Sequence, residues 1–159
     1  MQTVYAVELK HTASEFPELF DLLREYTDSS AVYRNFMIIS DRNESDICKQ
    51  ISMAAQSFSG IHSLLKFAKM KKEALFTDYG FEADGFTFLF KESLTAFCFI
   101  DRAKEDTEMA LLEMDEFLIA SCILDGQEFF FAESSQTELI LGLCRAYDIE
   151  VSFLNLDKY

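Results

Sequence analysis

Two apolar stretches joined by an Asp-Gly pair constrain the fold of this chain more than any other feature of its sequence. The stretches cover residues 117–124 and 127–132, and Asp125 and Gly126 separate them. A tight primed turn needs positive φ angles at its two central residues, which Asp and Gly adopt readily. The pattern therefore predicts an antiparallel hairpin over residues 117–132.

Alternating residue types and short apolar runs predict further strands. We expect the segments 86–90 and 94–100 to pair with each other across a turn at Lys91-Glu92-Ser93. Other strands are predicted over residues 3–9, 33–39 and 149–154.

Apolar residues spaced three and four apart predict helices between these strands. The helices are expected from an N-cap at Ser14 to Tyr26, from an N-cap at Asn43 towards Gly60, over 61–75, and from a capping box at Ser135–Glu138 to Tyr147. Residues 102–116 fit either a helix capped by Asp106 or an edge strand over 107–114, and the helix is favoured.

The length of the chain and the order of these elements predict a single α+β domain over residues 1–159. Half of the 159 residues are hydrophobic, which is enough to bury a core without disulfides or metal. Helices come mostly first, a run of strands follows, and one helix and one strand end the chain. Such runs of like elements favour a largely antiparallel sheet with helices packed mainly on one face.

The sequence contains no motif for catalysis, cofactor binding or metal binding, and we predict none of the three. Its five glycines are spaced too widely for a phosphate-binding loop, and its four cysteines too widely for a zinc knuckle or a redox dithiol. We expect His11 and His62 to be solvated or locally hydrogen-bonded. Buried free thiols are expected at most of the cysteines, which are Cys48, Cys98, Cys122 and Cys144.

Negative charge is the property in which this chain departs furthest from an average domain. The formal net charge is −14 at pH 7. Residues 1–80 contain 9 Lys/Arg and 11 Asp/Glu, whereas residues 81–159 contain 5 Lys/Arg and 17 Asp/Glu. Either a solvated face or a docking surface for a basic partner accounts for this concentration of acids. A cluster of lysines is expected on one helix and comprises Lys66, Lys69, Lys71 and Lys72.

The acid-rich segment 101–116 and one aromatic residue form the predicted partner-binding surface. Its acids are Asp101, Glu105, Asp106, Glu108, Glu113, Asp115 and Glu116. The aromatic residue is Phe130, in a Phe129-Phe130-Phe131 run that places rings on both faces of a strand. That run fits a central strand covered on both sides as well as a strand whose second face meets a partner.

Charge and the missing catalytic motifs favour a binding protein over an enzyme. An acidic field repels nucleic-acid phosphates and anionic lipids but attracts basic proteins, so neither nucleic acid nor membrane is expected as a partner. In size, acidity and lack of catalytic motifs the chain resembles toxin-neutralising immunity proteins and phage-borne inhibitors of host enzymes. The resemblance implies an inhibitor that covers the basic substrate groove of a nuclease or nucleic-acid-binding enzyme, with mimicry of DNA phosphates as a variant.

Two alternatives stay open: an enzyme with an unfamiliar active site, and a regulatory or structural subunit that forms a homodimer through its Phe-rich sheet. Residues 1–10 lack the basic and apolar regions of a signal peptide, and no run of eighteen apolar residues occurs. We therefore expect a cytoplasmic protein with reduced cysteines.

Overall fold

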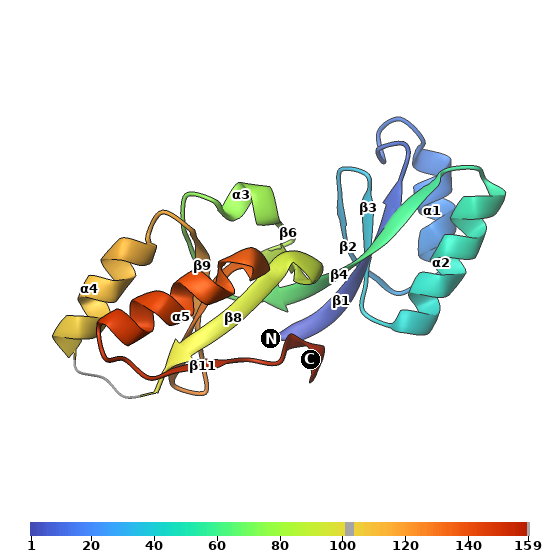
Figure 1. Cartoon of the computed structure of the whole chain (residues 1–159). Helices are drawn as coiled ribbons and strands as arrows, with labels where there is room; N and C mark the ends of the chain where they lie inside the picture. Colours follow the sequence, from blue (N-terminus) through green and yellow to red (C-terminus); the bar gives the residue numbers. More distant parts are fainter. Residues whose placement is uncertain (101–103, 159) are drawn as a thin grey trace. The chain divides into compact units, whose positions relative to one another are not determined.

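Helices and antiparallel strands are mixed along the chain, which has the predicted α+β fold (Figure 1). The structure is a computed structural model that describes residues 1–100 and 104–158, without the side chains of residues 29, 30, 104 and 105. Contacts within the chain group it into two compact units, each with its own sheet. Unit 1 comprises Met1–Phe67 and Glu82–Glu92, and unit 2 comprises Ala68–Phe81 and Ser93–Tyr159. The strands thus form two sheets where we expected one, and the assignment of residues 1–159 to one domain stays a prediction.

The sheet of unit 1 has six strands in the order β2-β3-β1-β4-β7-β6, and its edge strand β6 begins in the last two residues of the unit 2 segment Ala68–Phe81. Pairing is antiparallel between β2 and β3, β3 and β1, β1 and β4, and β4 and β7. The strands are β1 (Gln2–Leu9), β2 (Ser29–Tyr33), β3 (Phe36–Ile39), β4 (Phe58–Phe67), β6 (Gly80–Ala83) and β7 (Phe86–Phe90).

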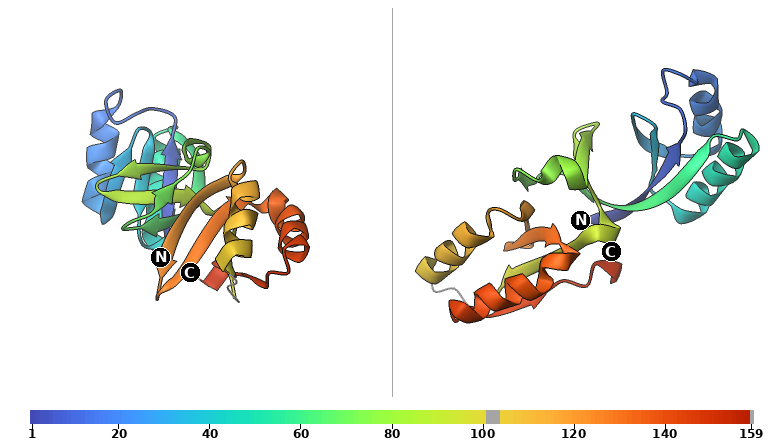
Figure 2. Two further views of the ribbon diagram at one scale, coloured as in Figure 1. Left: turned by 90° about the vertical axis from the view of Figure 1, so that its left-hand side faces the viewer. Right: turned by 45° about the horizontal axis from the view of Figure 1, so that its top comes forward.

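Helices α1 (Pro17–Tyr26) and α2 (Arg42–Ala54) lie side by side in unit 1, as the right view of Figure 2 shows. One face of the sheet meets them, because Val7 and Leu9 of β1 pack with Phe20 of α1 and Cys48 of α2 in one buried cluster. Alternation along β1 directs these side chains to the helices, as the sequence predicts.

Neither helix of unit 1 begins with the predicted cap. Helix α1 starts at Pro17, where the missing N–H costs nothing, and Ser14 makes no capping bond. The preceding turn is closed by Glu15, whose carboxylate accepts hydrogen bonds from the backbone N–H and the hydroxyl of Thr12. The cap of α2 is Asp41, which accepts from the backbone N–H groups of Asn43 and Glu44.

Apolar spacing predicts that Ile47, Ile51, Ala55 and Phe58 form the buried face of this helix, and the face that α2 buries differs from it. Ile47 is 42 % exposed, whereas Ser45, Cys48 and Ser52 are fully buried. Two serines can face the core because each satisfies its hydroxyl inside the helix: Ser45 donates to the carbonyl of Arg42 and Ser52 to that of Cys48, both at 2.7 Å. A pattern that counts only apolar residues therefore selects the wrong stripe.

The helix predicted over 61–75 is wrong, because residues 61–67 belong to strand β4 and Lys71–Lys72 form a further strand, β5. Strand β4 pairs with β1 on one side, along Gln2 to Leu9. On its other side it pairs with β7, along Thr87 to Phe90. Adjacent residues Leu64 and Leu65 are both fully buried, as happens in a strand covered on both faces. Such a continuous apolar run has no period that separates strand from helix.

The strand predicted over 33–39 is instead the turn and second strand of a hairpin. Strand β2 ends at Tyr33, Arg34 adopts a positive φ of 54°, and Tyr33 pairs with Phe36 of β3. The turn was missed because its left-handed residue is an arginine rather than the glycine or asparagine that usually marks such a position.

The sheet of unit 2 has five antiparallel strands in the order β11-β8-β10-β9-β5. The predicted Asp-Gly hairpin is confirmed: Asp125 and Gly126 have φ angles of 50° and 80°, and Leu124 pairs with Gln127. The strands are β5 (Lys71–Lys72), β8 (Leu94–Phe99), β9 (Leu118–Leu124), β10 (Gln127–Glu133) and β11 (Val151–Phe153).

Strands β7 and β8 are both present, but they do not pair as predicted. The short 3-10 turn at Lys91–Ser93 separates them, with β7 in the sheet of unit 1 and β8 in the sheet of unit 2. Strand β8 lies between β10 and β11 instead. A short connection between two strands therefore marks a passage between units rather than a hairpin.

Helices α4 (Lys104–Met114) and α5 (Thr137–Ala146) cover one face of this sheet (Figure 1), and a short helix α3 (Phe76–Tyr79) follows β5. Ala110 and Met114 of α4 and Ile140 and Cys144 of α5 pack against rings of the sheet that include Phe97. The helix favoured over 102–116 is confirmed, with Asp106 inside it rather than at its cap. Ser135 does not cap α5, which follows a 3-10 turn at Ser134–Gln136 and has no side-chain cap.

Candidate functional site

A cavity of about 410 Å³ in unit 2 is the site at which charged and apolar side chains converge. Its floor is the helix-covered face of the sheet, its first wall is α4, and its second wall is the chain at and after β5. We call it the acidic pocket and define it by Lys71, Glu73, Glu108, Leu111, Leu112, Asp115, Leu118, Ser121, Glu128 and Phe130.

The floor is built by the register of three strands. Lys71 of β5 pairs with Ser121 of β9, and Ser121 pairs with Phe130 of β10. Paired residues of neighbouring strands project from the same face, so these three side chains form one row. Phe130 packs in the core beneath α4, and the row leads from that core out to the edge strand β5.

The α4 wall follows from helical spacing. Ala110 and Met114 are fully buried against the sheet. The pocket is lined by the adjoining stripe of Glu108, Leu111, Leu112 and Asp115, which are three, four and seven residues apart. This wall therefore offers two carboxylates separated by leucine side chains, of which Leu112 is 69 % exposed.

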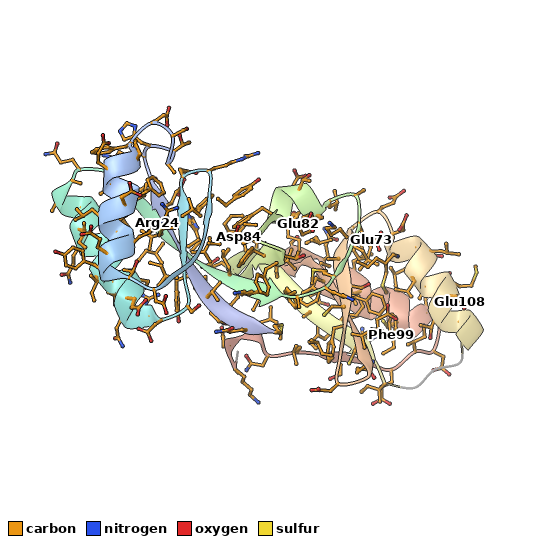
Figure 3. The ribbon with its side chains drawn as sticks, turned by 180° about the vertical axis from the view of Figure 1, so that it is seen from behind. Arg24, Glu73, Glu82, Asp84, Phe99 and Glu108 are labelled. Atoms are coloured by element: carbon orange, nitrogen blue, oxygen red, sulfur yellow. The ribbon has the colours of Figure 1, made fainter. Side chains whose placement is uncertain are left out.

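The second wall holds a lysine that is already paired with an acid. Lys71 Nζ lies 2.7 Å from Glu73 Oε1, and the backbone N–H of Glu73 donates to the carbonyl of Ile119. The hydrogen bond from Lys71 to Glu73 raises the pKa of Lys71, and the negative fields of Asp115 and Glu128 raise it further. In Figure 3, Glu73 projects from the segment after β5 and Glu108 from α4.

Three of the four carboxylates in the pocket form no ion pair within the described part of the chain. Glu73 pairs with Lys71, but no described Lys, Arg or His side chain forms an ion pair with Glu108, Asp115 or Glu128. The described lining therefore presents four acids and one lysine beside Leu111, Leu112, Leu118 and Phe130, an arrangement suited to a cation that carries apolar groups.

The structure brings together three of the eight predicted partner-binding residues: Glu108, Asp115 and Phe130 line the acidic pocket. Asp106 and Glu116 are exposed but do not line it. Asp101 and the side chain of Glu105 lie outside the described residues.

Glu113 has a structural partner. Its carboxylate accepts a hydrogen bond from the Tyr147 hydroxyl, which links α4 to the end of α5. This bond raises the pKa of Tyr147 because the phenol donates its proton to a carboxylate. Glu113 therefore braces two helices and does not face the pocket.

Sequence reasoning missed the three leucines of the pocket and four of its polar residues, the latter for different reasons. Glu128 and Ser121 could have been predicted from the sequence, because a two-residue loop at 125–126 fixes the pairs 123–128 and 121–130. Lys71 and Glu73 could not have been predicted, because the expected helix over 61–75 placed them with Lys66 and Lys69. The single-helix lysine cluster is wrong: Lys66 lies in β4 and Lys71 in β5.

The histidines show no catalytic grouping among the described residues. His62 Nε2 lies 3.0 Å from Glu8 Oε2, and the His62 ring makes edge-on contacts with the rings of Phe36 and Phe90 on the sheet of unit 1. His62 and His11 line neither the acidic pocket nor a second cavity of about 380 Å³, which Lys10, Met53, Gln56 and Phe58 line in unit 1.

The four cysteines are free thiols, and three of them are buried. Burial raises the pKa of Cys48 and that of Cys122 to about 11, and it also raises the pKa of Cys144. These groups remain neutral at physiological pH and behave as small apolar side chains. Among residues 1–100 and 104–158, no three His, Cys, Asp or Glu side chains are grouped as metal ligands, and no helix is long and apolar enough to cross a membrane.

Comparison with known proteins leaves the acidic pocket as the main functional observation. No protein-family model matches the chain, and neither curated proteins nor solved structures give a significant match.

Proposed function

We propose that this protein is a non-catalytic inhibitor of a basic protein and that unit 2 binds that partner. The observation that carries the proposal is the acidic pocket, which Glu108, Asp115 and Glu128 line without an ion pair to any described residue. Clustered carboxylates repel one another, and a partner's cations relieve that repulsion. The expected partner is a nuclease or other nucleic-acid enzyme, whose basic substrate groove the protein covers.

The charge of the two units supports the choice of unit 2 as the docking surface. The sequence of unit 2 contains 7 Lys/Arg and 16 Asp/Glu, for a net charge of −9, whereas unit 1 contains 7 and 12, for a net charge of −5. A concentrated negative field speeds encounter with a basic protein. The same field disfavours direct binding to nucleic acid.

A cytoplasmic location belongs to the same proposal. The four cysteines are free, and disulfides are rare in proteins of a reducing compartment. The Phe-rich strand lends no support to a homodimer, because Phe130 and Phe131 are 6 % and 0 % exposed within the single chain.

The test is quantitative capture from the native organism at low salt with two matched charge-reversal variants. The first, Glu108→Lys with Asp115→Lys, changes the acidic pocket. The second, Glu18→Lys with Glu25→Lys, makes the same change of charge on exposed positions of α1. We expect the wild type and the α1 variant to retain the same basic protein and the pocket variant to lose it.

Identification of the captured protein completes this test, since its nucleic-acid binding or cleavage can then be measured with and without the inhibitor. Equal capture by the two variants, or a captured enzyme whose activity is unchanged by saturating protein, contradicts the proposal.

A further inference from the structure

We infer that the acidic pocket is a receptor for one arginine side chain of the basic partner. This inference rests on the proposed function and makes it specific, because it names the chemical group that anchors the complex. It depends on three features of unit 2: apolar side chains that line the pocket, carboxylates from both α4 and the sheet, and a serine hydroxyl that faces the cavity.

The hydroxyl belongs to Ser121. This residue lines the pocket and is 5 % exposed. Its oxygen opens to the cavity, unlike the hydroxyls of Thr3 and Ser57, which among the described residues are wholly buried without a partner. A hydroxyl that faces a cavity offers a hydrogen bond to a ligand that enters it.

The carboxylates line the same pocket as Ser121 and come from two different elements. Glu108 and Asp115 belong to α4, whereas Glu128 lies on β10, next to Phe130 on the same face of the sheet. Glu73 already forms an ion pair with Lys71 at the edge of the sheet. A cation that enters between α4 and the floor therefore meets three carboxylates and the Ser121 oxygen, all of which are acceptors.

Arginine fits this arrangement better than lysine. Its planar guanidinium has five N–H donors that reach acceptors on several sides, whereas an ammonium is a compact and strongly hydrated charge. Guanidinium also stacks on apolar and aromatic surfaces, and its methylene stem packs on leucine side chains such as Leu112 and Leu118. A buried arginine anchor is a common energetic centre of protein interfaces.

The direct test is a titration of the whole protein with arginine blocked at both ends, Nα-acetyl-arginine N-methylamide, followed by NMR of leucine methyl groups. Blocked citrulline, which has nearly the same shape but no charge, is the matched control probe, and blocked lysine tests the choice of cation. We expect blocked arginine to shift the methyl signals of Leu111, Leu112 and Leu118 with a dissociation constant on the order of 1 mM. Blocked citrulline should shift none of them, and blocked lysine should bind more weakly.

Four variants locate the site. Glu108→Gln with Asp115→Asn should weaken blocked arginine about tenfold or more, because charge-assisted hydrogen bonds are lost. Ser121→Ala should weaken it about threefold or more, because one hydrogen bond from the guanidinium is lost. Lys71→Met should strengthen binding, because it removes a positive charge that lines the pocket. The control variant Asp106→Asn with Glu116→Gln removes two charges that lie outside the pocket, one in α4 and one just after it. It should change the affinity for blocked arginine little.

Each result decides the inference. Equal shifts with blocked citrulline or blocked lysine, shifts at leucines outside the pocket, or unchanged affinity in the Glu108/Asp115 variant would overturn it. If partner capture depends on Glu108 and Asp115 but blocked arginine does not bind, the arginine site is wrong and the inhibitor function stands. If blocked arginine binds as expected but no enzyme is inhibited, the function is wrong and the site stands.

Discussion

At the scale of residues, two glycines with opposite backbone requirements test the local structure. Gly126 has a φ of 80° in the β9–β10 turn, whereas Gly142 lies inside α5, where a methyl group in place of its hydrogen would meet no atom within 4 Å. We expect Gly126→Ala to lower the free energy of unfolding by about 1 kcal/mol and Gly142→Ala to raise it by about 0.5–1 kcal/mol. Urea unfolding of both variants measures the two signs, and equal signs would contradict the assigned backbone.

The buried thiols predict how stability depends on alkaline pH. The folded pKa of Cys48 is raised from 9.0 to about 11 because burial disfavours the thiolate. A raised folded pKa means that this contribution is fully present below pH 9 and is lost as the pH rises from about 9 to 11. We expect the free energy of unfolding to fall over that window, and to fall less in Cys48→Ala. Urea titrations at several pH values test this, and an identical pH dependence in the variant would contradict it.

At the scale of elements, α2 offers a test of which helical face is buried. Cys48 is fully buried, whereas the neighbouring Ile47 is 42 % exposed. We expect Cys48→Asn to cost about 2 kcal/mol or more, since it buries an amide without partners. Ile47→Asn should cost less than about 1 kcal/mol. Thermal unfolding of the two variants compares these costs, and the reverse order would restore the face expected from apolar spacing.

Turn chemistry and helical spacing explain how much of the fold could be predicted from sequence. The β9–β10 hairpin, the first strand and helix α5 were predicted because Asp-Gly, alternation and apolar spacing are local signals. Strand β4 was not, because a strand buried on both faces has no period of two. The β2–β3 turn was hidden because Arg34 takes the left-handed conformation without a glycine.

The candidate site shows the same division between local and distant information. Glu108 and Asp115 were found from charge density within one segment, and Phe130 from its place in the Phe run. Lys71 and Glu73 reach the pocket only because β5 pairs with β9, some 50 residues further along the chain. Pairing over such a distance leaves no pattern in the residues next to Lys71, so the second wall could not be predicted.

At the scale of the whole molecule, the division into units changes how the charge is understood. The two halves of the sequence differ sharply in charge, but the units differ less, with net charges of −5 and −9. Lys69, Lys71 and Lys72 belong to the acidic unit 2, whereas Glu82, Asp84 and Glu92 belong to unit 1. Specific docking therefore depends on where carboxylates converge rather than on the charge of either half.

The measurement that tests the central claim most directly is inhibition of the captured enzyme as a function of salt, with wild type and the Glu108→Lys/Asp115→Lys variant. If the acidic pocket binds a basic groove, the wild-type inhibition constant should rise about tenfold or more between about 50 mM and about 500 mM NaCl. The variant should fail to inhibit at either salt concentration. Inhibition that is insensitive to salt, or that survives the double reversal, would contradict the account.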